Sequence, residues 1–139
     1  VGNNVIIANN VPLGGHVEIE DSVVIGGNSA VQQFTRIGRL AMIGGMTGVL
    51  KDVIPFGLSI GNRNYLQGLN LIGLRRKNYE NKKIMELNKA YDEIFSSKNF
   101  HENLAKINGE FKDNELVSEV INFIAKDKKR AICTPLLKD

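Results

Sequence analysis

The first fifty-four residues carry an apolar position at every sixth place. An amphipathic helix repeats near 3.6 residues and a strand repeats every two, so neither explains this period. A chance run in an ordinary β-rich domain would not fill all nine positions, and a fixed short period instead predicts a repeat architecture. The nine hexads begin at Val1, Ile7, Leu13, Ile19, Ile25, Val31, Ile37, Ile43 and Val49.

A triangular solenoid accounts for this pattern, with one hexad on each face and three hexads in each turn. The aliphatic residue then points inward and stacks on its counterpart eighteen residues away, as Val1, Ile19 and Ile37 would. Successive turns would pair as parallel strands about 4.8 Å apart. Known hexapeptide repeats are left-handed, an exception to the right-handed crossover rule. The sequence therefore predicts a left-handed parallel β-helix over residues 1–54.

The second hexad position is small in six of the nine hexads. Glycine tolerates backbone angles that other residues avoid, so we expect these positions where the chain turns a corner. An open solenoid end exposes unpaired backbone and apolar core. Because Val1 is already in register, we expect earlier turns to precede it. The small residues are Gly2, Ala8, Gly14, Gly26, Gly38 and Gly44.

The period ends after Ile54, and a different organisation follows. Pro55 and Gly57 mark the exit, and residues 55–76 read as an ordered connector with alternating apolar and polar positions. Residues 77–139 predict a small α-helical C-terminal domain. Its first helix would begin near Lys77 and bury one face. That face carries Ile84, Leu87, Tyr91 and Ile94.

Two more helices and a tail complete this predicted domain. The second helix would start after an N-cap at Ser97 or Asn99 and end near Gly109. The third would start at Asn114, and the last dozen residues resemble a frayed basic tail. The apolar residues that we expect to be buried are Phe100, Leu104, Ile107, Val117, Val120, Ile121 and Ile124.

Composition and charge narrow the function classes. The chain is 42% hydrophobic and 24% charged, as in an ordinary globular protein, and has no apolar run long enough for a membrane span. Val1 begins a hexad and not the basic and apolar regions of a signal peptide. The single cysteine, Cys133, cannot form an internal disulfide, which fits a reducing, cytoplasmic compartment.

The positive charge lies in the second part of the chain. Residues 1–54 hold three basic and four acidic side chains, whereas residues 55–139 hold fifteen and eleven. This excess could serve nucleic acid, a phosphate-bearing ligand or an acidic protein partner. It could equally be the solvated surface of the predicted helices.

Four stretches carry a resemblance to a known family. In order they are NNVPLGGHVEIED, IGGNSAVQQFTRIG, MIGGMTGVLKDVIPF and GNRNYLQGLNLIGLRRKNY. Together they resemble the UDP-N-acetylglucosamine acyltransferases that open lipid A synthesis. The resemblance implies a homotrimer with active sites between adjacent solenoids. It also implies transfer of a 3-hydroxyacyl chain from acyl carrier protein to the 3-position of the UDP-sugar. No cofactor, metal, nucleic acid or stable membrane insertion is implied.

The resemblance also implies catalytic roles for particular residues. The family's general base is a histidine a few residues before the VGNN that begins this sequence, so we expect that base outside this chain. His16 matches a second family histidine near the sugar, acting either in proton transfer or only through hydrogen bonds. Gly15 matches the backbone N–H donor to the thioester oxyanion. Gly45 matches the position that limits acyl length, although it could also be only a corner glycine.

Further positions match the family's nucleotide site. Asn70 and Arg76 match residues near the uridine and phosphates, and Arg75 and Lys77 extend a basic cluster. Guanidinium groups suit this role because they pair bidentately with phosphate oxygens. One departure is Ile72, where the family usually has an acidic residue.

A second departure concerns the acceptor. Gln33 is retained as a substrate-binding position, but Gln32 stands where the family has a histidine. An amide cannot titrate near neutral pH, and it offers a fixed donor and acceptor. We therefore hypothesise that the 3-amino analogue of the UDP-sugar is accepted, alone or beside the ordinary one. The alternative is neutral change at a position behind the reacting groups.

Three other functions stay open at this point. The related UDP-3-O-acyl-glucosamine N-acyltransferase shares the solenoid and the carrier protein. A γ-type carbonic anhydrase would need three metal-binding histidines, whereas this chain has only His16 and His101. The third is a non-catalytic solenoid scaffold. A histidine just upstream of Val1 would favour acyl transfer.

Overall fold

The computed structural model describes residues 1–96 and 99–136. They form two compact units. The first contains residues 1–70 and also residues 129–136, and the second is Leu71–Lys128. The helical unit is thus inserted into the first unit, instead of extending to the end of the chain as the 77–139 assignment expected.

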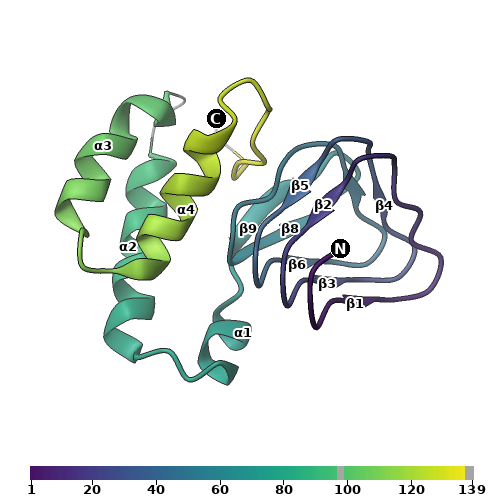
Figure 1. Cartoon of the computed structure of the whole chain (residues 1–139), viewed down its shortest axis with the longest axis horizontal. Coiled ribbons are helices and arrows are strands. Elements are labelled where there is room, and N and C mark those ends of the chain that lie inside the picture. The colour runs from purple at the N-terminus through teal and green to yellow at the C-terminus, as the bar shows by residue number, and fades with distance from the viewer. Residues whose placement is uncertain (97–98, 137–139) are drawn as a thin grey trace. The chain divides into compact units, whose positions relative to one another are not determined.

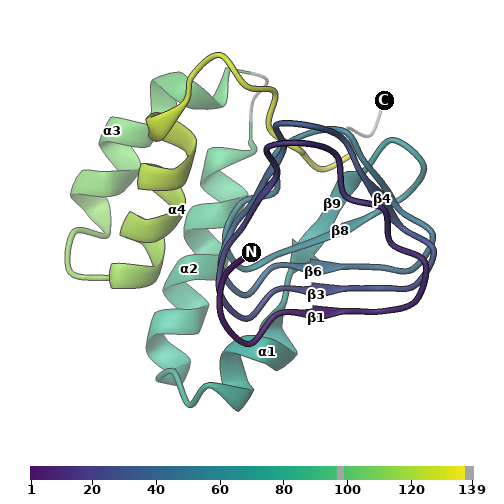
Figure 2. The ribbon, with the colours of Figure 1, turned by 45° about the vertical axis from the view of Figure 1, so that its right-hand side comes forward.

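The first unit is a solenoid, as the hexad pattern predicted. Its short strands occupy one hexad each and pair in parallel with the strand eighteen residues later, as Ile7 does with Ile25 and Ile19 with Ile37. Figure 2 shows β1, β3 and β6 stacked one above another. The strands are β1 Ile6–Ile7, β2 Glu18–Ile19, β3 Val24–Ile25, β4 Ala30–Val31, β5 Arg36–Ile37, β6 Met42–Ile43 and β7 Gly48–Val49.

The inward aliphatic residues form the solenoid core. Ile25, Ile37, Ile43 and Val49 are fully buried. Each fully buried aliphatic side chain stabilises the fold by roughly 1.5–3 kcal/mol relative to an exposed one. Three sheets result, one on each face, with strand orders β1-β3-β6-β8-β9, β2-β5 and β4-β7.

The corners differ from the expectation. The left-handed backbone angle falls on the fourth hexad position, not on the glycine-rich second one. Those glycines are required by close approach, because a Cβ at Gly14 would lie 2.4 Å from the Gln33 nitrogen and one at Gly26 would lie 2.5 Å from the Gly45 nitrogen. The left-handed residues are Asn4, Asn10, His16, Ser22, Asn28, Phe34, Leu40 and Met46.

The last turn breaks the period. Ile37 pairs with Val53 and Ile43 with Ser59, a separation of sixteen residues instead of eighteen. The chain then forms a hairpin from β8 Gly57–Ile60 and β9 Tyr65–Leu69, which pair in antiparallel fashion. The predicted connector, residues 55–76, therefore contains a hairpin that continues one sheet of the solenoid, and its last six residues form a helix.

The segment after the helices returns to the solenoid. We call residues 129–136 the strap. Asp52 N–H donates to the Ala131 carbonyl (2.9 Å), Cys133 N–H donates to the Asp52 carbonyl (2.8 Å), and Leu66 N–H donates to the Thr134 carbonyl (3.0 Å). The prediction of a frayed tail is wrong for these residues, because Ile132 and Cys133 are buried and the backbone is paired. Residues 137–139 lie outside the described part of the chain.

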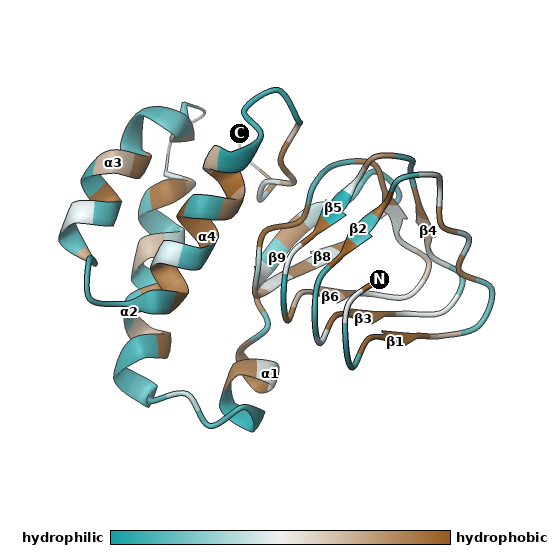
Figure 3. Ribbon diagram, viewed as in Figure 1, coloured by the Kyte–Doolittle hydropathy of each residue, from teal (hydrophilic) through white to brown (hydrophobic). Residues whose placement is uncertain are grey.

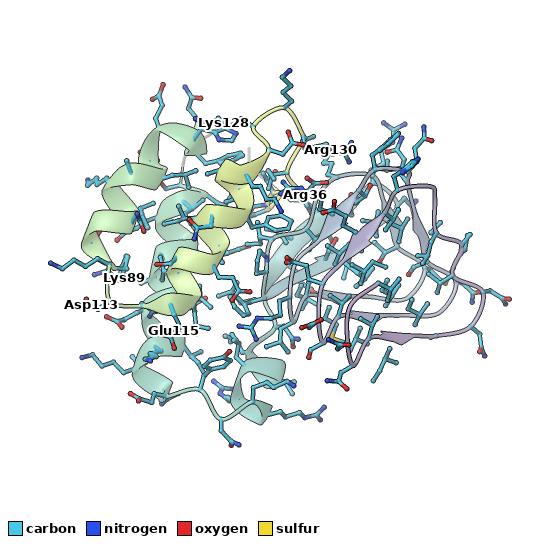
Figure 4. All side chains as sticks on the ribbon, viewed as in Figure 1. Arg36, Lys89, Asp113, Glu115, Lys128 and Arg130 are labelled. Carbon is cyan, nitrogen blue, oxygen red and sulfur yellow. The ribbon has the colours of Figure 1, made fainter. Side chains whose placement is uncertain are left out.

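A buried charge cluster fixes the strap. Asp52 is fully buried; Arg36 Nε donates to its Oδ2 at 2.8 Å, and Arg130 Nη2 donates to its Oδ1 at 3.2 Å. Figure 4 labels both arginines. Because an unpaired buried charge is strongly unfavourable, Asp52 needs these partners.

The helical unit contains α1 Leu71–Arg76, α2 Asn81–Ile94, α3 Phe100–Glu110 and α4 Glu115–Lys126 (Figure 1). Figure 3 shows apolar and polar stretches alternating along α2, α3 and α4. The three predicted helices are confirmed. Helix α2 begins later than Lys77, because α1 ends at Arg76 and Asn78 takes a left-handed angle.

The helix ends and faces agree with the sequence in part. Asn114 caps α4, accepting hydrogen bonds from Leu116 N–H (3.0 Å) and Val117 N–H (3.3 Å). Asn99 precedes α3 without a side-chain cap bond, and Ser97 lies outside the described residues. Tyr91 is only half-buried. Within residues 1–96 and 99–136, no helix combines the length and hydropathy needed to cross a membrane.

Candidate functional site

Four of the predicted site residues meet at one corner of the solenoid. We call this the histidine corner: Gly14, Gly15 and His16, with Gln32, Gln33 and Phe34 one turn on. The two segments are held together by hydrogen bonds from Gly14 N–H to the Val31 carbonyl (2.8 Å) and from Phe34 N–H to the Gly15 carbonyl (2.9 Å). The eighteen-residue repeat thus places these side chains side by side.

His16 stands at the tip of this corner. Its backbone is left-handed (φ 57°), and its exposed ring stacks on Phe34 with centroids 5.0 Å apart and planes inclined by 5°. Phe34 occupies the same left-handed position one turn later. The stacking fixes the plane of the imidazole while leaving its ring nitrogens at the surface.

Sequence reasoning missed Phe34. The signal was present, because an aromatic residue at the fourth hexad position eighteen residues after a histidine must lie beside it. Phe34 is 53% exposed, although a large apolar ring is usually buried.

Gly15 differs from the other glycines of the repeat. A Cβ built on it would meet nothing within 4 Å, and its backbone is not left-handed. No described residue accepts a hydrogen bond from its N–H. Neither packing nor conformation therefore requires glycine here, and the N–H is open to an incoming group.

Gln32 and Gln33 have fixed backbones and exposed side chains. Gln32 N–H donates to the Val49 carbonyl (2.9 Å), and its own carbonyl accepts from Thr35 N–H (3.3 Å). Both amides extend from the turn that lies against Gly14 and Gly15. They can donate and accept hydrogen bonds beside His16 without titrating.

Gly45 lies at a different corner. It is exposed, next to Met46, and a Cβ on it would lie 3.4 Å from the Gly27 carbonyl oxygen. The face that carries β4 and β7 separates this corner from the histidine corner in chain order. One solenoid therefore presents His16 and Gly45 on separate edges.

The predicted nucleotide-binding residues are divided between the units. Asn70 belongs to the solenoid unit, where its N–H donates to the Phe56 carbonyl (2.7 Å) and its Nδ2 donates to the Leu40 carbonyl (2.9 Å). Arg75 and Arg76 end α1 in the helical unit, and Lys77 follows that helix. All three side chains are exposed, as is that of Ile72 near the start of α1. Asn70 thus has a structural role in closing a corner, which the sequence did not indicate.

The cysteine is not a candidate nucleophile. Cys133 is buried in the strap, with its Sγ 3.7 Å from Ser59 Oγ. Burial raises the pKa of this thiol to about 11, so it is protonated at neutral pH. Its role is to pack the strap against the last turn.

Comparison with known proteins gives a consistent picture. The family described as UDP-N-acetylglucosamine O-acyltransferase, domain 2, matches residues 52–133. The acyl-[acyl-carrier-protein]–UDP-N-acetylglucosamine O-acyltransferase of Rhizobium etli is 47% identical over 136 residues, covering 97% of this chain and 50% of that protein. The enzyme of the same name from Sinorhizobium fredii is 42% identical over the same length and the same shares.

Solved structures agree with these relatives. The Arabidopsis UDP-N-acetylglucosamine acyltransferase superposes with a TM-score of 0.89 at 37% identity, covering 95% of this chain and 49% of that one. The chain spans about half the length of the curated relatives it matches.

Proposed function

The chain belongs to the UDP-N-acetylglucosamine O-acyltransferase family, and we propose that the full-length protein performs the family's reaction. It would transfer a 3-hydroxyacyl chain from acyl carrier protein to the 3-position of UDP-N-acetylglucosamine, the first step of lipid A synthesis. Among the alternatives, the N-acyltransferase, the carbonic anhydrase and the scaffold all lack this support.

The histidine corner is the observation that carries the proposal. An acyl thioester placed above it would have its carbonyl oxygen near the open Gly15 N–H, a donor aimed at the charge that develops during attack. His16, oriented by Phe34, would contact the sugar hydroxyl that attacks. Gln32 and Gln33 would hydrogen-bond the sugar. The general base, on the resemblance, would be a histidine upstream of Val1.

We propose that the active protein is a homotrimer with each site between two copies. The outer positions of the sheet that contains β1, β3, β6 and β8 are apolar, whereas those of β2 and β5 are the charged Glu18 and Arg36. In a cyclic trimer the interface joins different patches of the two copies. It can therefore bring Gly45 of one copy to His16 of the next. The apolar positions are Ile6, Val24, Met42 and Leu58.

Five finer statements belong to this proposal. The solenoid would be left-handed, as in other hexapeptide repeats, and the reaction would take place in the cytoplasm. Cys133, buried and unpaired by a disulfide, is compatible with a reducing compartment. Gly45 would limit acyl length, and the exposed Arg75, Arg76 and Lys77 would contact nucleotide phosphates. Asn70 would hold its corner and also lie near the uridine.

We also propose that Gln32 permits the 3-amino analogue of the sugar nucleotide. Its exposed amide lies at the histidine corner, where it can accept a hydrogen bond from an amino group without changing charge. Neutral change at this position would leave the two acceptors in the same ratio in Gln32→His.

The test is acyl transfer by the full-length protein. Purified enzyme would be incubated with 3-hydroxyacyl carrier protein and, in parallel, with UDP-N-acetylglucosamine, its 3-amino analogue and the 3-O-acylated glucosamine nucleotide. We expect an ester with the first acceptor. Transfer only to the third acceptor would identify an N-acyltransferase, and no transfer with any of them would contradict the proposal.

A further inference from the structure

The shortened register of the last turn begins at the histidine corner. In the regular repeat, the N–H of the second hexad position donates to a carbonyl seventeen residues later, and Gln32 N–H still does so with Val49. Gly38 N–H donates instead to the Val53 carbonyl, only fifteen residues later. The break therefore lies between Gln32 and Gly38, in a stretch that starts within the histidine corner and includes Arg36 of β5.

The carboxylate of Asp52 takes the place of a backbone carbonyl at this break. One turn earlier, Glu18 N–H donates to the Thr35 carbonyl at 3.0 Å, in the regular way. Arg36 N–H donates to Asp52 Oδ1, also at 3.0 Å. The same oxygen accepts from Nε (3.3 Å) and Nη2 (3.2 Å) of Arg130 in the strap. Arg130 therefore fixes the oxygen that holds the backbone just after the corner.

Thr35 connects this arginine to both segments of the histidine corner. Thr35 is fully buried, and its Oγ1 accepts from Arg130 Nη2 at 3.4 Å. Its N–H donates to the Gln32 carbonyl at 3.3 Å. Its carbonyl accepts from the N–H of Glu18, which lies two residues after His16. A displacement of Thr35 would therefore reach the turn that carries the glutamines and also the segment that carries the histidine.

We propose that Arg130 is a positioning residue for the histidine corner. Through Asp52 and Thr35 it holds the turn that carries Phe34, and the Phe34 ring sets the plane of the His16 imidazole. Arginine suits this role because its planar fork can donate to a carboxylate and a hydroxyl at the same time. The inference rests on the proposed acyl transfer, in which a misplacement of about 1 Å can lower the rate by about 10²-fold.

The experiment uses Arg130→Met in the full-length protein. Methionine keeps an apolar stem at this half-buried position and removes the donors, while Asp52 keeps its bond to Arg36 Nε. Ser59→Ala is the matched control, because the buried Ser59 hydroxyl contacts Cys133 in the strap with an Oγ–Sγ distance of 3.7 Å. Ser59 belongs to β8, which lies in a different sheet from β5. The control therefore weakens the attachment of the strap at another place.

The first readout is the NMR signal of the His16 ring, measured at one fixed pH in protein that carries ¹³C-labelled histidine. Its absence in His16→Ala assigns it. Stacking on Phe34 at 5.0 Å should shift the ring-proton signals away from those of a free imidazole. We expect Arg130→Met to move them back toward the free values and Ser59→Ala to leave them unchanged. Unchanged signals in folded Arg130→Met would overturn the proposal, whether or not the protein transfers acyl groups.

The second readout is acyl transfer to the sugar nucleotide, measured where urea unfolding shows each variant to be fully native. We expect Arg130→Met to lower kcat/KM by about tenfold and Ser59→Ala to retain the activity of the unsubstituted protein. Equal losses in the two variants would show that the strap acts only through stability, which would overturn the positioning role. If the unsubstituted protein transfers no acyl group, the proposed function fails, and the His16 signal decides the inference alone.

Thr35→Val is a second variant that keeps the test decisive if Arg130→Met does not fold. Valine suits this inward position, because Val17 occupies it one turn earlier. Only the hydroxyl that Arg130 contacts is removed. We expect the His16 signals to move in the same direction and kcat/KM to fall by a few-fold, with both restored in Thr35→Ser. Unchanged signals in Thr35→Val would contradict the path through Thr35.

Discussion

The histidine corner and the strap junction are built from the same solenoid in opposite ways. At the corner the eighteen-residue register is intact, and His16, Gln32 and Gln33 are exposed. At the junction the register shortens to sixteen residues and Asp52 is fully buried between two arginines. A regular repeat supplies its own backbone partners and leaves corner side chains available for chemistry. The irregular last turn is instead covered by the strap, which the ion pairs of Asp52 hold in place.

Removing the charge at the junction should have the largest effect. Asp52→Ala leaves Arg36 and Arg130 without their buried partner, so we expect the free energy of unfolding of the solenoid unit to fall by about 3–5 kcal/mol. Urea unfolding followed by circular dichroism would measure it. Glu18→Ala, an exposed acid on a neighbouring strand, is the control. Equal losses of unfolding free energy in the two variants would show that Asp52 and its two arginines do not hold the strap on the solenoid.

Removing the corner imidazole should affect activity and not stability. If His16 takes part in proton transfer, His16→Ala should lower kcat/KM of the full-length enzyme by about 10²-fold or more. A hydrogen-bonding role alone predicts roughly tenfold. The urea concentration at the midpoint of unfolding should match that of the unsubstituted protein, because the ring is exposed. A large loss of stability would mean that the corner, like the junction, is structural.

The two adjacent glycines of the corner should separate packing from function. Gly14→Ala places a methyl 2.4 Å from the Gln33 nitrogen, so we expect a loss of about 1–3 kcal/mol in the free energy of unfolding. Gly15→Ala meets open space and should change stability by less than about 0.5 kcal/mol. It should nevertheless reduce acyl transfer, because the methyl crowds the approach to the Gly15 N–H. Full activity in Gly15→Ala would contradict the proposed role of the Gly15 N–H as an oxyanion donor.

The smallest effect is expected at Gln32. Gln32→His should leave stability unchanged, because the side chain is exposed. We expect the ratio of kcat/KM for the 3-amino acceptor to that for the 3-hydroxyl acceptor to fall by a few-fold, since one hydrogen bond is worth about 1 kcal/mol. Side-by-side kinetics of both acceptors on both proteins would measure the ratio. An unchanged ratio would support neutral change.

The sequence predicted the regular part of the fold because one inward aliphatic residue per hexad is a local and repeated constraint. It also predicted helices α2 to α4 from their apolar faces. The strap was missed, because Ile132 and Cys133 are a short apolar pair in a basic stretch and their partners lie some eighty residues earlier. The reason for the hexad glycines was also misjudged, since the close approach of the next turn leaves no mark in the sequence.

Only those site residues that the repeat itself brings together could be predicted as neighbours. The eighteen-residue spacing brings His16, Gln32 and Gln33 together, and it would have added Phe34 had the fourth position been followed. Counting in hexads also places Gly45 at a different corner from His16, because the three faces follow one another in a fixed order. The double hydrogen bond of Asn70 to the Leu40 and Phe56 segments depends on the hairpin and was not predictable.

Subunit complementation tests the central claim, a catalytic site composed of two copies, most directly. Full-length His16→Ala and Gly45→Trp would each be prepared, shown to have lost most of their acyl transfer, and then co-expressed so that mixed trimers form. If His16 of one copy works with Gly45 of the next, about a quarter of the interfaces in random mixtures carry both native residues and activity returns to about that fraction. Mixed trimers that stay as inactive as the separate variants would contradict a site shared between copies.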